Sequence, residues 1–171
     1  VYASVNTGLT DTADNWAKGY INHCYTLGII AGMGDGTFQP NGSVTGAQVA
    51  KMLLVALGYN PEVSGLVGAE WLSNTVVLAG DVGILDNFTG DLTLPISRED
   101  AALLIYNALY AQMVSTSSDG VITPRTTTGY EWITNPDNGT SAAVPTTVAL
   151  NLLSDKFGMT EVTGILESNE W

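Results

Sequence analysis

Apolar residues in the first two thirds of the chain recur at intervals of three and four, the spacing of a helix with one buried face. Two stripes follow the pattern i, i+3, i+4, i+7, i+8: Val49, Met52, Leu53, Ala56 and Leu57, and then Ala101, Leu104, Ile105, Ala108 and Leu109. Thr45 with Gln48 forms a capping-box pattern before the first stripe. Ser97 with Asp100 approximates the same box before the second. The pattern predicts two amphipathic helices.

A third stripe lies upstream and ends at Gly28, a residue typical of a helix end. Its members are Trp16, Ala17, Tyr20, Ile21, Cys24 and Leu27. The stripe recurs later in weaker form, because placing Trp16 over Trp71 brings Gly28 onto Gly83. We therefore expect two units of helix, loop and helix, which cover residues 10–60 and 61–111.

A unit of this size cannot bury its apolar face alone, so the two units must pack against each other or against a third. The predicted fold class is mostly α, a small bundle of tandem helix-loop-helix repeats. Residues 112–171 form a separate, irregular segment, and residues 113–142 are rich in Ser, Thr, Gly and Pro. This composition predicts loops, with a hairpin as the alternative.

Two further elements are predicted in the irregular segment. The pattern favours a helix over residues 146–157, with Gly158 as its stop, and a short strand over residues 160–166. The chain stops at Trp171, soon after this predicted strand. That ending suggests a piece of a longer protein.

The charge balance limits the partners. The net charge is −12, from 17 acidic and 5 basic residues. Such a chain repels phosphate backbones, so nucleic acid is not an expected partner. Cys24 is the single cysteine, which excludes an intrachain disulfide and a cysteine-based metal cluster. No apolar run approaches the roughly 18 residues of a membrane span, so no transmembrane segment is expected.

Catalytic chemistry has little support. His23 is the only histidine, and no nucleophile or metal set accompanies it in the sequence. Asp35 lies in a glycine-rich loop that lacks the alternating oxygen ligands of an EF-hand, so a calcium loop is not favoured. We expect no catalytic residue, no metal and no cofactor.

Several motifs carry a family resemblance. The first unit contains Asn15-Trp16-Ala17, Leu27-Gly28-Ile29-Ile30, Gly34-Asp35-Gly36-Thr37-Phe38 and Val44-Thr45-Gly46-Ala47-Gln48. It resembles an S-layer homology repeat along its whole length. The second unit keeps Trp71, Gly83-Ile84-Leu85 and Ile96-Ser97-Arg98-Glu99-Asp100 but loses the Gly-Asp loop. Two tandem repeats of this family are therefore predicted.

The resemblance implies an exported, non-catalytic module at the bacterial cell surface, in the wall or S-layer. Members of the family bind secondary cell-wall polysaccharide, often bearing pyruvate ketals, in grooves between neighbouring repeats of a helical bundle. Carried onto this chain, the binding residues are Trp16, Gly34, Asp35, Thr45, Gln48, Trp71, Ser97, Arg98 and Glu99.

Arg98 is the strongest of these candidates, because a guanidinium can hold a carboxylate through two parallel hydrogen bonds. In the first unit, Gly46 stands where the family has an arginine and Gln48 where it has a glutamate. The first unit therefore lacks the carboxylate clamp.

Each candidate has a structural alternative. Trp16 and Trp71 could fill the core, Arg98 could pair with Glu99 or another carboxylate, and Asp35 could close its own turn. The whole chain also has an alternative function, as a structural subunit or assembly domain of a surface lattice or filament that binds no polysaccharide. A homo-oligomer is the expected partner in that case.

Overall fold

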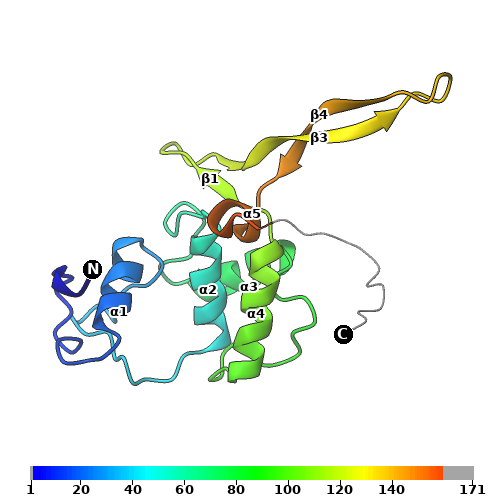
Figure 1. Ribbon diagram of the computed structural model, residues 1–171. Helices are drawn as coiled ribbons and strands as arrows, with labels where there is room; N and C mark the ends of the chain where they lie inside the picture. Colours follow the sequence, from blue (N-terminus) through cyan, green and yellow to red (C-terminus); the bar gives the residue numbers. More distant parts are fainter. Residues whose placement is uncertain (1, 160–171) are drawn as a thin grey trace, which may run out of the picture.

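The computed structural model describes residues 2–159, and its centre is a group of three packed helices (Figure 1). Helix α2 (Gly46–Ala56) contacts both α3 (Trp71–Asp81) and α4 (Arg98–Tyr110). The 3-10 helix η1 (Tyr2–Ser4) and helix α1 (Lys18–Thr26) contact each other and lie to one side of this group (Figure 1). The loop after α1 connects the two parts.

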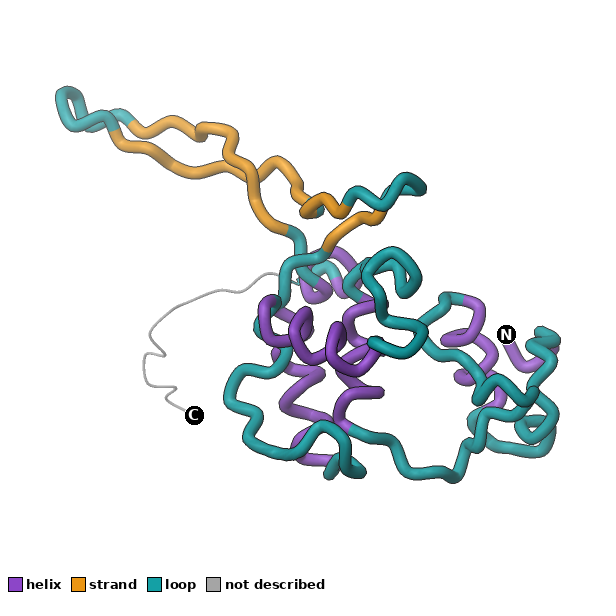
Figure 2. The backbone as a smooth tube through the Cα atoms, turned by 180° about the vertical axis from the view of Figure 1, so that it is seen from behind, coloured by secondary structure: helices purple, strands orange, loops and turns teal. Residues whose placement is uncertain are grey.

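Two antiparallel hairpins follow the helices (Figure 2). Strand β1 (Val114–Thr116) pairs with β2 (Ile122–Pro124), and β3 (Thr126–Thr134) pairs with β4 (Ser141–Ala149). Helix α5 (Leu152–Phe157) then packs on α4. The β3–β4 hairpin projects away from the helices, and we call it the arm, residues 126–149.

The predicted fold class, mostly α, is wrong. Of the described residues, 33% are in helices and 18% in strands or bridges, and the two sheets among them make this a mixed fold. The expected helix over residues 146–157 is also wrong in its first part, because Thr146–Ala149 belong to β4. Thr146, Thr147 and Val148 are β-branched and favour a strand. The strand predicted over residues 160–166 lies outside the described residues.

The core is built from the inner faces of α2, α3 and α4. Its fully buried members are Ala50, Leu54, Leu57, Leu66, Ala79, Ile84, Leu104 and Ala108. Members of both predicted stripes are among them, but Ile105 is exposed, so the second stripe is only partly buried. Helix α1 contributes nothing to this core cluster.

Both predicted helix caps are confirmed. Thr45 and Gln48 form the full capping box of α2, and the Ser97 hydroxyl accepts a hydrogen bond from the Asp100 amide at the start of α4. These caps satisfy amide groups that a helix cannot pair internally. None of the helices within residues 2–159 is long and apolar enough to cross a membrane.

Candidate functional site

A cleft of about 600 Å³ opens between the loop after α1, one face of α2 and the start of α3. Its volume is within the roughly 300–1,000 Å³ typical of ligand pockets. Gln48, Lys51 and Met52 line it from α2, and Trp71 closes it from α3. The opposite wall is the loop 29–44. The cleft therefore lies where the segments 10–60 and 61–111 meet.

Lys51 is the cation of this cleft. It is half-buried, and burial lowers the pKa of its ammonium group. No carboxylate among the described residues lies within salt-bridge distance of it. Its Nζ lies 5.6 Å from the centre of the Trp71 ring, a cation–π contact. A partly desolvated cation without a carboxylate partner is well placed to attract an anionic group.

Trp71 presents a half-buried ring to the cleft from the first residue of α3. An aromatic face accepts the C–H face of a sugar ring, because both surfaces are flat and apolar. Together, Lys51 and Trp71 offer one charged and one stacking contact side by side.

Asp11 fixes the loop wall of the cleft. Its carboxylate accepts hydrogen bonds from the amides of Phe38 (2.8 Å) and Gln39 (2.7 Å). The bond from Phe38, followed by that from Gln39, keeps the pKa of Asp11 below its usual value. Gln39 has a positive φ of 59°, which is uncommon for a residue with a side chain. The Asp11 contacts hold this conformation beside the cleft.

Asp35 closes its own turn, as the structural alternative proposed. Its Oδ1 accepts hydrogen bonds from the hydroxyl of Thr37 (2.6 Å) and from the amide of Thr37 (2.9 Å), and these bonds lower the Asp35 pKa. Gly34 has a φ of +89°, which only glycine adopts readily. Neither Gly34 nor Asp35 lines the cleft.

The start of α2 is covered by a backbone segment of the second unit. The amides of Gly46 and Ala47 donate to the carbonyls of Leu94 and Leu92, at 3.3 Å and 2.8 Å. A Cβ at Gly46 would lie 2.8 Å from Leu92 Cδ2 and 3.1 Å from Leu92 Cα. At the position where the resemblance implies an arginine, a side chain would therefore fit only if Leu92 shifted.

Two more predicted site residues, Thr45 and Gln48, form the N-terminal capping box of α2. Gln48 Oε1 accepts from the Thr45 amide at 2.9 Å, and Thr45 Oγ1 accepts from the Gln48 amide at 3.3 Å. Gln48 still lines the cleft, whereas Thr45 does not. Gln48 can offer its amide nitrogen to a ligand while its oxygen caps the helix.

Ser97, Arg98 and Glu99 form an exposed group at the start of α4. They do not line the cleft. Within the described part of the chain, Arg98 forms no salt bridge, so the alternative of an ion pair with Glu99 is not seen there.

Trp16 is 86% exposed, so the alternative of core packing is wrong for this residue. Its ring makes an edge contact with Tyr20, with centroids 6.4 Å apart. Trp16 is absent from the cleft wall. Trp71 alone of the two tryptophans lies at the cleft.

The structure therefore brings together two predicted residues, Gln48 and Trp71, and adds Lys51, which the sequence analysis missed. A usable signal was present, because Lys51 follows Gln48 by three residues and so lies on the same helix face. Asp11 was also missed, since its contacts with Phe38 and Gln39 span more than 25 positions. No cluster of three metal-ligating side chains occurs among residues 2–159.

Comparison with known proteins identifies the first unit. Residues 9–50 match the family model of the S-layer homology domain. A cell surface protein of Thermoanaerobacter kivui is 33% identical over 101 residues, which is 59% of this chain and 12% of that protein. A middle cell wall protein of Brevibacillus brevis is 28% identical over 109 residues, which is 64% of this chain and 10% of that protein.

Enzymes are also among the relatives. An exoglucanase of Acetivibrio thermocellus is 33% identical over 81 residues, or 44% of this chain, and the match covers only 8% of that enzyme. The chain thus spans about a tenth of the length of the curated relatives it matches. No solved structure matches it at a significant level.

The class of module follows from these matches. The chain carries an S-layer homology domain at residues 9–50, and its relatives include S-layer and cell-surface proteins. A cell-surface or cell-wall location is thereby indicated.

Proposed function

We propose that the chain is a non-catalytic anchoring module that binds a secondary cell-wall polysaccharide in the cleft between α2, α3 and the loop 29–44. The observation that carries the proposal is Lys51, a half-buried cation with no described carboxylate partner, set against the ring of Trp71. On a chain with a net charge of −12, Lys51 is a local positive charge that favours binding of an anionic group in the cleft.

The chemistry fits a polysaccharide that carries acidic substituents. An ammonium group is a compact point charge that grips a carboxylate or phosphate without requiring the planar geometry of a guanidinium. Pyruvyl ketals supply such a carboxylate on a sugar ring. Trp71 would stack on the ring while Lys51 binds its acidic group. Lys51 would then provide the positive charge that an arginine at position 46 is implied to provide in the family.

The cleft position supports the same function. It lies between the proposed repeats at 10–60 and 61–111, and polymer binding at a junction uses both units. Arg98, with Ser97 and Glu99, stays a prediction for a second contact along the polymer, since its guanidinium is exposed and forms no salt bridge within residues 2–159. The other predicted site residues do not line the cleft. They would contact the polymer outside it or hold the conformation of its loop and helix: Trp16, Gly34, Asp35 and Thr45.

The test is binding of the purified chain to isolated wall polysaccharide, compared between wild type and Lys51→Met. Methionine keeps an unbranched side chain of similar length and removes the charge. A hydrogen bond to a charged group contributes about 1.5–3 kcal/mol, so affinity should fall about ten- to hundredfold. Calorimetric titration measures the change, and an unchanged far-UV spectrum shows that the fold is kept.

Two control variants locate the effect. Lys18→Met removes a cation from α1, which does not line the cleft, and should leave affinity unchanged. Arg98→Ala tests the second contact and should cost less than Lys51→Met. Equal affinity of Lys51→Met and wild type would exclude the cleft as the binding site.

A further inference from the structure

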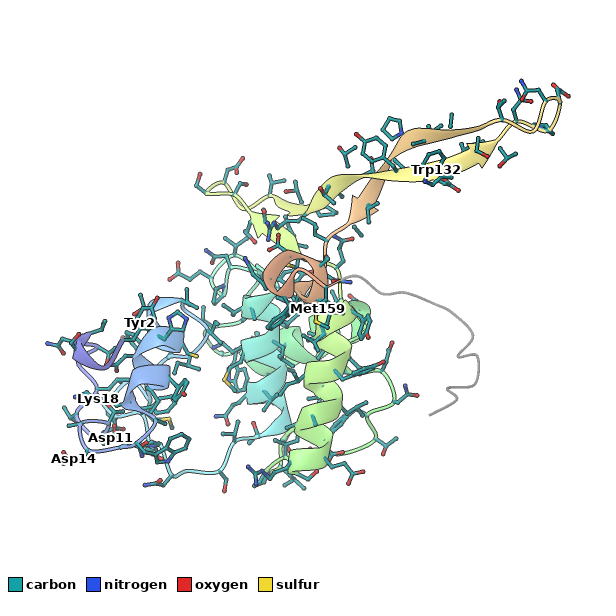
Figure 3. All side chains as sticks on the ribbon, viewed as in Figure 1. Tyr2, Asp11, Asp14, Lys18, Trp132 and Met159 are labelled. Carbon is teal, nitrogen blue, oxygen red and sulfur yellow. The ribbon has the colours of Figure 1, made fainter. Side chains whose placement is uncertain are left out.

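The arm has an exposed two-stranded structure with little to support it. All residues of β4 are exposed, as are all residues of β3 except the half-buried Gly129. Trp132 is 72% exposed and lies well away from the helices (Figure 3). A hairpin of two strands is marginally stable in water, and a third strand or a packed face normally completes it.

The root of the arm is nevertheless firmly fixed. Arg125, just before β3, makes a bidentate pair with Asp155 of α5, with N–O distances of 2.8 Å and 2.9 Å. The side-chain nitrogen of Gln112 donates to the carbonyls of Arg125 (2.7 Å) and Met113 (3.1 Å). The arm is therefore held out in a defined direction.

The outer edge of β3 presents a row of backbone groups without described partners. The Leu150 amide donates to Arg125, and the Asn135 amide donates to Thr140, so odd-numbered residues of β3 take part in the hydrogen-bonded pairs of the ladder. Even-numbered residues point their N–H and C=O groups outward. Five positions form this edge: Thr126, Thr128, Tyr130, Trp132 and Thr134.

The β3 edge lacks the residues that usually prevent an edge strand from pairing with another strand. Exposed edge strands commonly contain charged residues or proline for this reason. The outer edge of β4 contains Pro145, which has no N–H group, but β3 contains no proline and only one charged residue, Glu131. Glu131 points to the face opposite Tyr130 and Trp132, because side chains alternate along a strand.

The charge distribution argues for a second copy of the chain as the occupant. The arm holds two of the 17 acidic residues, Glu131 and Asp137, and none of the five basic ones. The other acidic residues are elsewhere, so two copies repel each other least through their arms. The β3 edge is also self-complementary when two copies meet antiparallel about a two-fold axis.

We propose that β3 of one copy pairs antiparallel with β3 of a second copy, which joins two arms into a four-stranded sheet. Tyr130 and Trp132 of both copies then share one face of that sheet, and this apolar face supplies the packing that the isolated hairpin lacks. The arm lies apart from the cleft, so this pairing is independent of wall binding.

The experiment compares two proline variants that form a cross-strand pair, Thr128→Pro on β3 and Thr147→Pro on β4. Both residues are exposed threonines with outward N–H groups, so both variants strain the hairpin alike. Only Thr128→Pro removes a donor from the proposed interface. Mass is measured by sedimentation over a concentration series of the full chain.

Wild type and Thr147→Pro are expected to form dimers as concentration rises, and Thr128→Pro is expected to stay monomeric with wall binding unchanged. Burial of Trp132 in the dimer should also shift its fluorescence to shorter wavelength. A wild-type chain that stays monomeric up to the highest concentration would overturn the proposal. So would dimers that persist in Thr128→Pro or are lost equally in both variants.

Discussion

Gly46 stands where the family resemblance implies an arginine, and this one position makes the chain differ from the family's pattern of binding residues. The Leu92 side chain and backbone lie against its Cα, and the Leu92 and Leu94 carbonyls accept the first amides of α2. A side chain at this position would require Leu92 to shift, whereas Lys51, which lies further along the helix, lines the cleft and places a positive charge there.

Replacement of Gly46 by alanine should therefore destabilise the chain. The added Cβ overpacks against Leu92, at a cost of about 1–3 kcal/mol. Gly80→Ala is the matched control, since a Cβ there meets nothing within 4 Å and the residue lies within a helix. That change should stabilise by about 0.5 kcal/mol. Denaturant unfolding of both variants measures the difference, and equal stabilities would contradict the close approach.

Residue-scale prediction from sequence succeeded where the chemistry is local. Thr45, Gln48 and Ser97 are caps because their side chains reach amides three residues away. Asp35 closes a turn for the same reason. Lys51 was missed because its environment is set by Trp71 and by the loop 29–44, which only the tertiary structure brings to it.

At the scale of elements, helix periodicity placed α2 and α4 well. A hairpin was an alternative to loops over residues 113–142, but the extension of the arm to residue 149 was not predicted. Apolar residues at 148, 152 and 153 resembled a helical stripe, yet the β-branched Thr146–Val148 segment pairs with Thr127–Gly129. Nonlocal pairing overrode the local pattern there. Asn151, which caps α5 through Ser154, marks the true helix start and was visible in the sequence.

The arm root should weaken in acid. Hydrogen bonds from Arg125, followed by Lys156, lower the pKa of Asp155 below its usual value. A carboxylate with a lowered folded pKa stabilises the fold above its unfolded pKa, and that contribution is lost as pH falls through the folded value. We expect the protection factors of the Leu150 and Arg125 amides, which are corrected for the slower intrinsic exchange in acid, to fall as the pH drops below the ordinary aspartate pKa range and through the lowered pKa of Asp155.

Asp155→Asn provides the control for this acid effect. The variant removes the charge at all pH values, so exchange at Leu150 should already be faster at pH 6 and should respond less to acid. Wild-type protection factors at Leu150 that are equal at pH 6 and pH 3, after correction for the slower intrinsic exchange in acid, would show that the Arg125–Asp155 pair does not hold the arm.

For the whole molecule, the structure separates two kinds of surface. The cleft contains a cation within an acidic chain. The arm has only two charged residues and projects away from the helices (Figures 1 and 3). We propose that the cleft binds an anionic polymer and that the arm binds another copy of the chain, so that one module uses both surfaces together.

The central claim is that the cleft recognises an acidic group on a wall polysaccharide. The most direct measurement is the affinity of the wild-type chain for one wall polysaccharide before and after chemical removal of its acidic substituents. We expect binding to weaken at least tenfold when those groups are removed, because loss of a charged hydrogen bond costs about 1.5–3 kcal/mol. Equal affinity for both forms, or no binding to either, would contradict it.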